Sequence, residues 1–347
     1  MSLFPPLQAH FCQADFVSGR ADAEFSRIWQ QGRHGWFYGT DKVKIHHSYW
    51  LNAKATASLL LVPGRIEAGH KFAEFIADAL ASGYQVFVLD HRGQGASERL
   101  QTDPQLGYVR HFSDYIDDLQ EFINTIITPL NRLPLLSVAH SMGGAILTGY
   151  LQRERQSPIR AAVFSSPMWG IHTHPIPDKL ALPLAKIACW LNALLSKKPW
   201  YLPGQGPYQN RPFLDNDLTL SAERYQWFRQ LYQRYPLYQL GGVSWHWLCE
   251  ALKTCRQFPQ QRAPDIPCFL LQGAADLVVS NTRQLALWQQ WQQQAGFMPA
   301  VTIANARHEL LNETDDIRRQ WFMAVNQFLQ QVLETPAQAP LKPDRHE

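Results

Sequence analysis

The chain has 347 residues, of which 46% are hydrophobic and 18% charged, as in an ordered globular protein and unlike a disordered one. Its length suits a single α/β core with an insertion. The formal net charge of +3 is compatible with an anionic membrane surface but too small to indicate a nucleic-acid partner.

Short apolar runs bounded by Gly, Pro or Asp predict seven strands, at residues 45–50, 58–62, 85–89, 135–139, 161–165, 268–272 and 300–303. Helical patterns, for example at residues 70–82 and 113–127, separate the strands between residues 58 and 165. Nearly continuous apolar strands joined by helices favour a parallel sheet that is covered on both faces. We therefore predict an α/β fold with a mostly parallel central sheet.

The alternation of strands and helices stops after residue 166. The next segment is rich in Trp, Tyr, Pro and Leu, and it predicts helices at residues 178–195, 221–235 and 243–258. A connection of about a hundred residues is too long to be a simple loop. We predict an α/β core formed by residues 1–166 and 263–334, an inserted helical cap at 167–262, and a disordered tail at 335–347.

Ser141 is the candidate nucleophile. It lies in residues 139–144 (AHSMGG), between a predicted strand and a helical pattern that begins at Gly143. A nucleophile elbow requires such a strained strand–turn–helix, with small residues two positions before and after the serine. Ala139 replaces the first glycine of the usual Gly-x-Ser-x-Gly pattern and is small enough to fit. The pentapeptide alone is equally compatible with an ordinary turn that contains an incidental serine.

Two further loops support the elbow. The predicted strand 58–62 runs into residues 63–66 (PGRI), where a hydrolase of this type has its second oxyanion donor. We expect the backbone N–H groups of Arg65 and Met142 to form the oxyanion hole. The strand at 85–89 ends in a glycine-rich turn at residues 90–97 (DHRGQGAS), which we expect Asp90 and Arg92 to brace.

An acid and a histidine follow Ser141 in the order that elbow hydrolases use, Ser, then Asp or Glu, then His. Asp276 comes just after the predicted strand 268–272, and His308 lies in the loop after the strand 300–303. Carboxyl ends of parallel strands meet at one edge of a sheet, so we expect the three side chains to converge there. His308 would take the serine proton while Asp276 orients the imidazole, and this chemistry requires neither a metal nor an organic cofactor.

Other residues near these motifs are weaker candidates. The side chain of His140 is expected to point away from the elbow, and His91 and His111 are expected near the rim of a pocket. Glu309 and Glu313 follow the candidate base too closely to brace its imidazole from behind.

Taken together, residues 63–65, 90–97 and 139–144 and the loops of Asp276 and His308 resemble the monoacylglycerol lipase-like branch of the α/β-hydrolases, with its serine aminopeptidase S33-type domain. The run 62–67 (VPGRIE) and Ala139 are similar to lysophospholipases of the bacterial inner membrane, and the resemblance covers residues 45–329. It implies the α/β-hydrolase fold and hydrolysis of the acyl ester of lysophospholipids, such as lysophosphatidylethanolamine, with release of a fatty acid. It also implies acyl transfer to a lipid alcohol and a peripheral location on the inner membrane.

The predicted helix 178–195 bears on a lipid substrate. Lysines and aromatic residues accompany an apolar stripe at helical spacing, formed by Leu180, Leu184, Ile187, Leu191 and Leu194. Such a stripe either lies in a bilayer interface or packs against the core, and the sequence leaves both open. Three arginines in or near the cap are candidate contacts for a phosphate: Arg211, Arg224 and Arg229.

Two alternative functions remain open at this stage. A monoacylglycerol lipase or general carboxylesterase would use the same triad on another ester, and a non-catalytic lipid-binding protein would use the same scaffold. The first residues lack the basic and apolar regions of a secretory signal, and no apolar stretch of about 18 residues is present. The five scattered cysteines form no metal-binding pattern. We therefore expect a protein with reduced thiols, soluble or peripheral, on the cytoplasmic side of the membrane.

Overall fold

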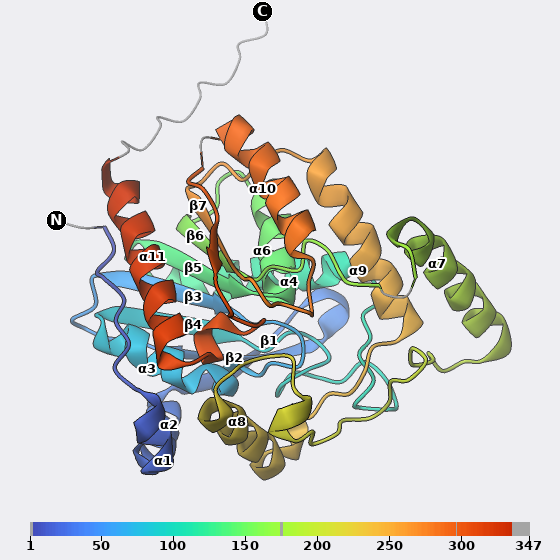
Figure 1. Cartoon of the computed structure of the whole chain (residues 1–347), viewed down its shortest axis with the longest axis horizontal. Coiled ribbons are helices and arrows are strands. Elements are labelled where there is room, and N and C mark those ends of the chain that lie inside the picture. The colour runs from blue at the N-terminus through green and yellow to red at the C-terminus, as the bar shows by residue number, and fades with distance from the viewer. Residues whose placement is uncertain (1–2, 174–175, 296, 335–347) are drawn as a thin grey trace, which may run out of the picture.

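The computed structural model describes residues 3–173, 176–295 and 297–334. Its centre is an eight-stranded sheet with the order β1-β2-β4-β3-β5-β6-β7-β8 (Figure 1). β1 pairs antiparallel with β2 and β2 with β4, whereas all the remaining pairs are parallel. The strands are β1 (Arg33–Tyr38), β2 (Lys44–Trp50), β3 (Ala57–Val62), β4 (Tyr84–Leu89), β5 (Leu135–His140), β6 (Ile159–Ser165), β7 (Cys268–Gly273) and β8 (Val301–Ile303).

Helices cover both faces of the sheet, which confirms the predicted fold class. Successive strand residues point to opposite faces, so Leu60 and Val62 of β3 join one apolar cluster while Leu59 and Leu61 join the other. The first cluster is covered by α4 (Phe112–Phe122), α6 (Met142–Arg153) and α10 (Asn281–Ala295). The second is covered by α2 (Arg20–Gln31), α3 (Ala73–Ala81) and α11 (Asp315–Glu334).

The seven predicted strands are all present, with bounds that differ by no more than two residues. The helix predicted at 70–82 begins as a 3₁₀ turn, Gly69–Phe72, before α3, and the one at 113–127 is α4 followed by a π-helical turn, Ile123–Ile127, and the short α5 (Thr128–Leu130). Four elements have no predicted counterpart: β1, α1 (Gln13–Val17), α2 and α10.

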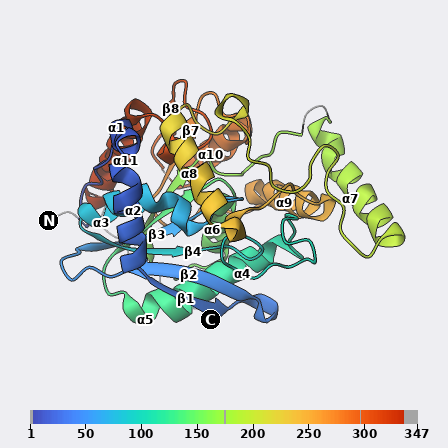
Figure 2. The same cartoon turned by 90° about the horizontal axis from the view of Figure 1, so that it is seen from below.

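Between β6 and β7 the chain forms three longer helices, α7 (Asp178–Leu195), α8 (Ala222–Arg234) and α9 (Trp245–Gln257). α7 lies at the outer edge of the molecule in both views (Figures 1 and 2) and packs against α9 through small and apolar side chains. None of the described helices is both long and apolar enough to span a membrane. The tail predicted at 335–347 lies outside the described residues.

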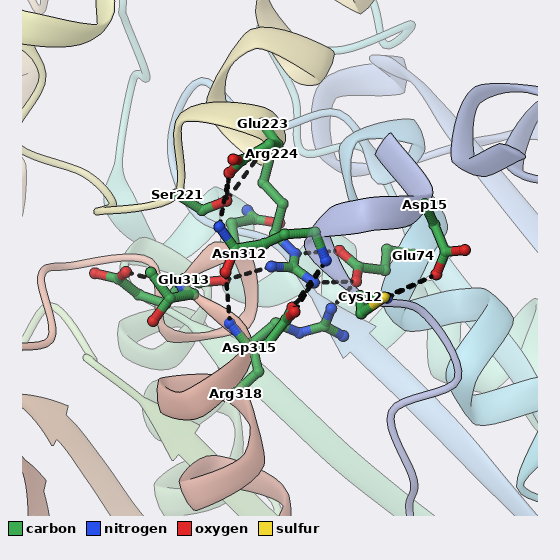
Figure 3. Close-up of polar contacts among 12 residues, drawn as sticks. Cys12, Asp15, Glu74, Ser221, Glu223, Arg224, Asn312, Glu313, Asp315 and Arg318 are labelled. Atoms are coloured by element: carbon green, nitrogen blue, oxygen red, sulfur yellow. Dashed lines mark hydrogen bonds and ion pairs between the residues drawn. The ribbon is translucent and has the colours of Figure 1, made fainter. Parts of the chain in front are cut away.

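A buried ionic cluster joins α8 to the core (Figure 3). Arg224 of α8 donates two hydrogen bonds of 2.8 Å to the carboxylate of Glu74 on α3 and one of 2.8 Å to Asp315 at the start of α11. Arg318 of α11 also contacts Glu74, and it pairs with Asp78 at 2.5 Å. Bidentate pairing of this kind fixes geometry as well as charge, so one carboxylate connects two helices of the core with one from the segment after β6.

We predict that Glu74→Gln lowers the free energy of unfolding by about 3 kcal/mol or more, because two buried guanidinium groups lose their shared carboxylate. Urea denaturation followed by circular dichroism measures this change. Arg319→Gln is the matched control, since Arg319 pairs with Asp316 on the exposed side of α11. A Glu74→Gln protein as stable as this control would contradict the structural role of the cluster.

Candidate active site

Ser141 lies in a strained turn between β5 and α6. Its backbone has φ 51° and ψ −118°, a region that non-glycine residues rarely occupy. Ala139 is fully buried in β5, where it is in register with Val62 of β3. A Cβ atom on Gly143 would lie 2.1 Å from the carbonyl oxygen of Val62, so only glycine lets α6 begin this close to β3.

The structure brings the three candidate catalytic side chains into one hydrogen-bonded chain. His308 Nε2 is 2.9 Å from Ser141 Oγ, and His308 Nδ1 is 2.8 Å from Asp276 Oδ2. Ser141 lies in the turn between β5 and α6, Asp276 follows β7 and His308 follows β8. Ser141 is only 7% exposed, so the group that would attack a substrate is largely shielded from water.

Asp276 is held as a carboxylate. Burial opposes ionisation, but the neighbouring imidazole of His308 and hydrogen bonds outweigh it and lower the pKa of Asp276. The backbone N–H groups of Val278 and Val279 donate to Oδ1 at 2.8 and 3.1 Å, which leaves Oδ2 for His308. An ionised, oriented acid is what an imidazole needs when it receives a proton.

The candidate oxyanion donors are both free. The N–H groups of Arg65 and Met142 have no hydrogen-bond acceptor among the described residues. Gln94 Nε2 donates to the carbonyl oxygen of Gly64 at 2.7 Å, and because N–H and C=O of a trans peptide point in opposite directions, the N–H of Arg65 points away from Gln94. A Cβ atom on Gly64 would be 3.0 Å from the Cβ of Ser141, so this loop lies directly against the nucleophile turn.

The glycine-rich turn at residues 90–97 supports this loop. His91 Nε2 lies 2.9 Å from the carbonyl oxygen of Pro63. Within the turn, Asp90 accepts the N–H of Ala96 at 2.8 Å, and Arg92 donates to Asp118 of α4 at 2.6 Å. The bracing predicted for Asp90 and Arg92 is confirmed.

A buried cluster of charges that was not predicted from the sequence lies behind the triad. Glu67 Oε1 accepts from Lys71 Nζ at 3.0 Å, and Lys71 also donates to Glu309 at 2.6 Å. Glu67 Oε2 is 2.9 Å from His140 Nδ1. Burial opposes both charges, yet the contacts lower the pKa of Glu67 and raise that of His140. In sequence, Glu67 and Lys71 are four residues apart, and this spacing of opposite charges was the available signal for an ion pair.

Several of the weaker candidates lie elsewhere than expected. The His140 ring does not point away from the site, because its centroid is 4.7 Å from that of His308. His91 is fully buried rather than at a rim, and His111 is exposed at the start of α4, 3.9 Å from Glu250. Glu313 accepts the N–H of Arg307 at 2.8 Å and makes no contact with the His308 ring.

The arginines of the segment after β6 are largely occupied. Arg224 is engaged by carboxylates as described, and Arg229 donates to Asn210 at 2.8 Å and stacks over Tyr208. Arg65, in contrast, has no carboxylate within 4 Å among the described residues. Its guanidinium donates to the carbonyl oxygen of Gly241 at 2.9 Å and lies over the ring of Trp247. Burial lowers the pKa of Arg65 to about 10.

The segment that leaves β6 is attached to the nucleophile itself. The N–H of Met168 donates to the carbonyl oxygen of Ser141 at 2.9 Å, while the N–H of Ser141 donates to Ser165 at 3.2 Å. The hydrogen-bonding groups of the Ser141 backbone thus connect the elbow both to the end of β6 and to the start of the segment that follows.

The chain is similar to several known proteins. The chain is 33% identical to lysophospholipase L2 of Escherichia coli K12 over 307 residues, 87% of this chain and 88% of that protein. It is 31% identical to a probable lysophospholipase L2 of Haemophilus influenzae over 88% of this chain and 95% of that one. Among solved structures, a monoglyceride lipase of Saccharomyces cerevisiae shares the fold with a TM-score of 0.65 and 18% identity, covering 88% of this chain and 96% of that one.

The family model described as serine aminopeptidase, S33, matches residues 53–315, a range that includes Ser141, Asp276 and His308. The chain belongs to this family of α/β-hydrolases.

Proposed function

We propose that the chain is a serine esterase that hydrolyses the acyl ester of lysophospholipids, such as lysophosphatidylethanolamine, and releases a fatty acid. The observation that supports ester hydrolysis is the hydrogen-bonded chain from Ser141 through His308 to Asp276. The names of the bacterial relatives support the substrate class.

In the first step, His308 Nε2 takes the proton of Ser141 as Oγ attacks the ester carbonyl, and Asp276 stabilises the resulting imidazolium. The N–H groups of Arg65 and Met142 hold the developing oxyanion. His308 then gives the proton to the departing glycerol oxygen. Water activated by His308 releases the fatty acid in the second step, and a lipid alcohol in place of that water would give acyl transfer.

A monoacylglycerol lipase or general carboxylesterase is the second candidate, since the yeast neighbour with the same fold is a monoglyceride lipase. The two substrate classes differ by a phosphate. The guanidinium of Arg65 favours the charged class, because it is a partly buried cation with no carboxylate partner among the described residues, one residue from the glycine that lies against Ser141. We propose that this side chain contacts the substrate phosphate.

We also propose that α7 rests on a membrane surface. Several of its large apolar side chains face solvent, with Trp190 64% and Leu194 66% exposed. Exposed lysines lie on and just after the helix, at Lys179, Lys186, Lys197 and Lys198. An apolar face flanked by cations suits the interface of a bilayer that contains anionic lipid. Such a bilayer would be the inner membrane, approached from its cytoplasmic side.

The catalytic assignment predicts that Ser141→Ala abolishes release of fatty acid from lysophosphatidylethanolamine, because no nucleophile remains. Asp276→Asn is expected to lower kcat by about 10⁴-fold, since an amide favours the wrong tautomer of His308. Both are measured by fatty-acid release and by labelling with a fluorophosphonate. Thermal unfolding near that of the wild type shows that the fold is kept, and full activity of Ser141→Ala would reject the assignment. Wild-type protein that the probe fails to label would instead favour a non-catalytic lipid-binding protein.

The phosphate contact predicts that Arg65→Met lowers kcat/KM for lysophosphatidylethanolamine about tenfold or more, from loss of a charge-assisted contact. Hydrolysis of monoacylglycerol should change little, because any residue at this position keeps the backbone N–H. Fatty-acid release from the two substrates, with matched acyl chains, measures this ratio. Arg229→Met is the control, and an equal loss on both substrates for Arg65→Met would contradict the contact.

The membrane proposal predicts that replacing Ile187 and Leu194 by Asp reduces binding to vesicles of phosphatidylethanolamine and phosphatidylglycerol at least fivefold, because two apolar contacts are replaced by negative charges. Co-sedimentation measures the binding, and hydrolysis of a water-soluble ester should be unchanged. Met323→Asp, on the exposed face of α11, is the matched control. Equal vesicle binding by the Ile187 and Leu194 double variant and by the Met323→Asp control would exclude α7 as the membrane contact.

A further inference from the structure

We propose that Glu67 is a positioning residue. It holds three parts of the site in a fixed relative position: the oxyanion loop (residues 63–66), the nucleophile turn and the loop of His308. Its carboxylate is almost fully buried. The same oxygen, Oε2, accepts the N–H of Gly64 at 2.5 Å and contacts His140 Nδ1 at 2.9 Å. Gly64 precedes the candidate oxyanion donor and His140 precedes the nucleophile, so one carboxylate oxygen connects these two parts of the site.

His140 extends the connection to the third part. Its Nε2 is 3.3 Å from the backbone carbonyl oxygen of His308. A carbonyl oxygen and a carboxylate oxygen can only accept hydrogen bonds, so both ring nitrogens of His140 must donate. The geometry therefore requires His140 to be an imidazolium, with one N–H directed to Glu67 and the other to the main chain of the catalytic histidine.

The surrounding charges make this state favourable. Glu67 and Lys71 face His140 from the segment after β3, while His308 and Glu309 face it from the segment after β8. Two cations, His140 and Lys71, are balanced by two carboxylates, Glu67 and Glu309. Such a buried set is tolerated only when its members are paired, and removal of one member affects all the others.

The connection has a defined dependence on pH. The contacts with Glu67 raise the pKa of His140 in the folded protein, against the effect of burial. A group whose pKa is raised by folding contributes stability that is complete below its unfolded pKa and is lost as the pH rises through its folded pKa. Above that point His140 has a single N–H and releases either Glu67 or the carbonyl of His308. We expect kcat to fall as this proton leaves, with KM little changed, because the loss concerns alignment of the reacting groups rather than contacts with the acyl chain.

The first test is Glu67→Gln, which keeps the shape of the side chain and removes its charge. We expect kcat for a water-soluble ester to fall about 30- to 100-fold, with KM within about threefold of the wild type, as misalignment of a site produces. The labelling rate of Ser141 by a fluorophosphonate should fall in parallel. Glu74→Gln, the same substitution in the buried cluster under α8, controls for destabilisation and should keep its kcat. Wild-type kcat in Glu67→Gln would overturn the inference.

A second measurement uses the wild-type chain and does not depend on the folding of that variant. Nuclear magnetic resonance of protein labelled with ¹⁵N-histidine reports the protonation of each ring nitrogen, and His140 is assigned from the signals missing in His140→Gln. We expect protons on both ring nitrogens at about pH 7, and loss of one of them in step with the fall of kcat at higher pH. A neutral His140 at about pH 7, or a proton lost without any effect on kcat, would overturn the proposal.

These outcomes are separate from those of the proposed function. The water-soluble ester and the probe report on Ser141 whatever the natural substrate is. If the wild type neither hydrolyses the water-soluble ester nor reacts with the probe, the esterase assignment fails. If the wild type reacts with both and Glu67→Gln reacts equally fast, only the role of Glu67 fails.

Discussion

The parallel pairing of β3 with β5 is the constraint on which the rest of the site depends. The two strands run in register from Ser58 opposite Leu135 to Val62 opposite Ala139, so they end at the same level of the sheet. The loop after β3 and the turn after β5 therefore leave the sheet side by side. At Gly143 they lie so close together that a Cβ atom would not fit. The close approach of a candidate oxyanion loop and a strained serine is a direct consequence of this main-chain pairing.

The sequence predicted the sheet well because its strands are buried on both faces and appear as short apolar runs. β1 escaped prediction because it is an edge strand, in which only Phe37 is buried and no alternation is visible. α10 was missed for a related reason: its exposed face is rich in glutamine, and its buried stripe is narrow, formed by Gln284, Leu287, Trp288 and Trp291. Both elements depend on tertiary contacts more than on their own pattern.

The reacting side chains were easier to anticipate than the groups behind them. Ser141, Asp276 and His308 each follow a strand that was predicted, and parallel strands place such residues at one edge. Glu67 and Lys71 lie in segments where charged residues are usually solvated, and nothing in their sequence context indicates burial. Their partners, His140 and Glu309, are distant along the chain, so the ion pairs became visible only with the fold. The predicted direction of the His140 side chain was wrong because its partners, too, are distant along the chain.

The hydrogen bond from the N–H of Met168 to the carbonyl oxygen of Ser141 attaches the helical segment between β6 and β7 to the main chain of the nucleophile. α7, the first longer helix of that segment, lies at the edge of the molecule. A displacement of Met168 would therefore act on the carbonyl group of the nucleophile through this single bond. The main chain of residue 141 thus joins the start of this segment directly to the turn that carries the serine oxygen.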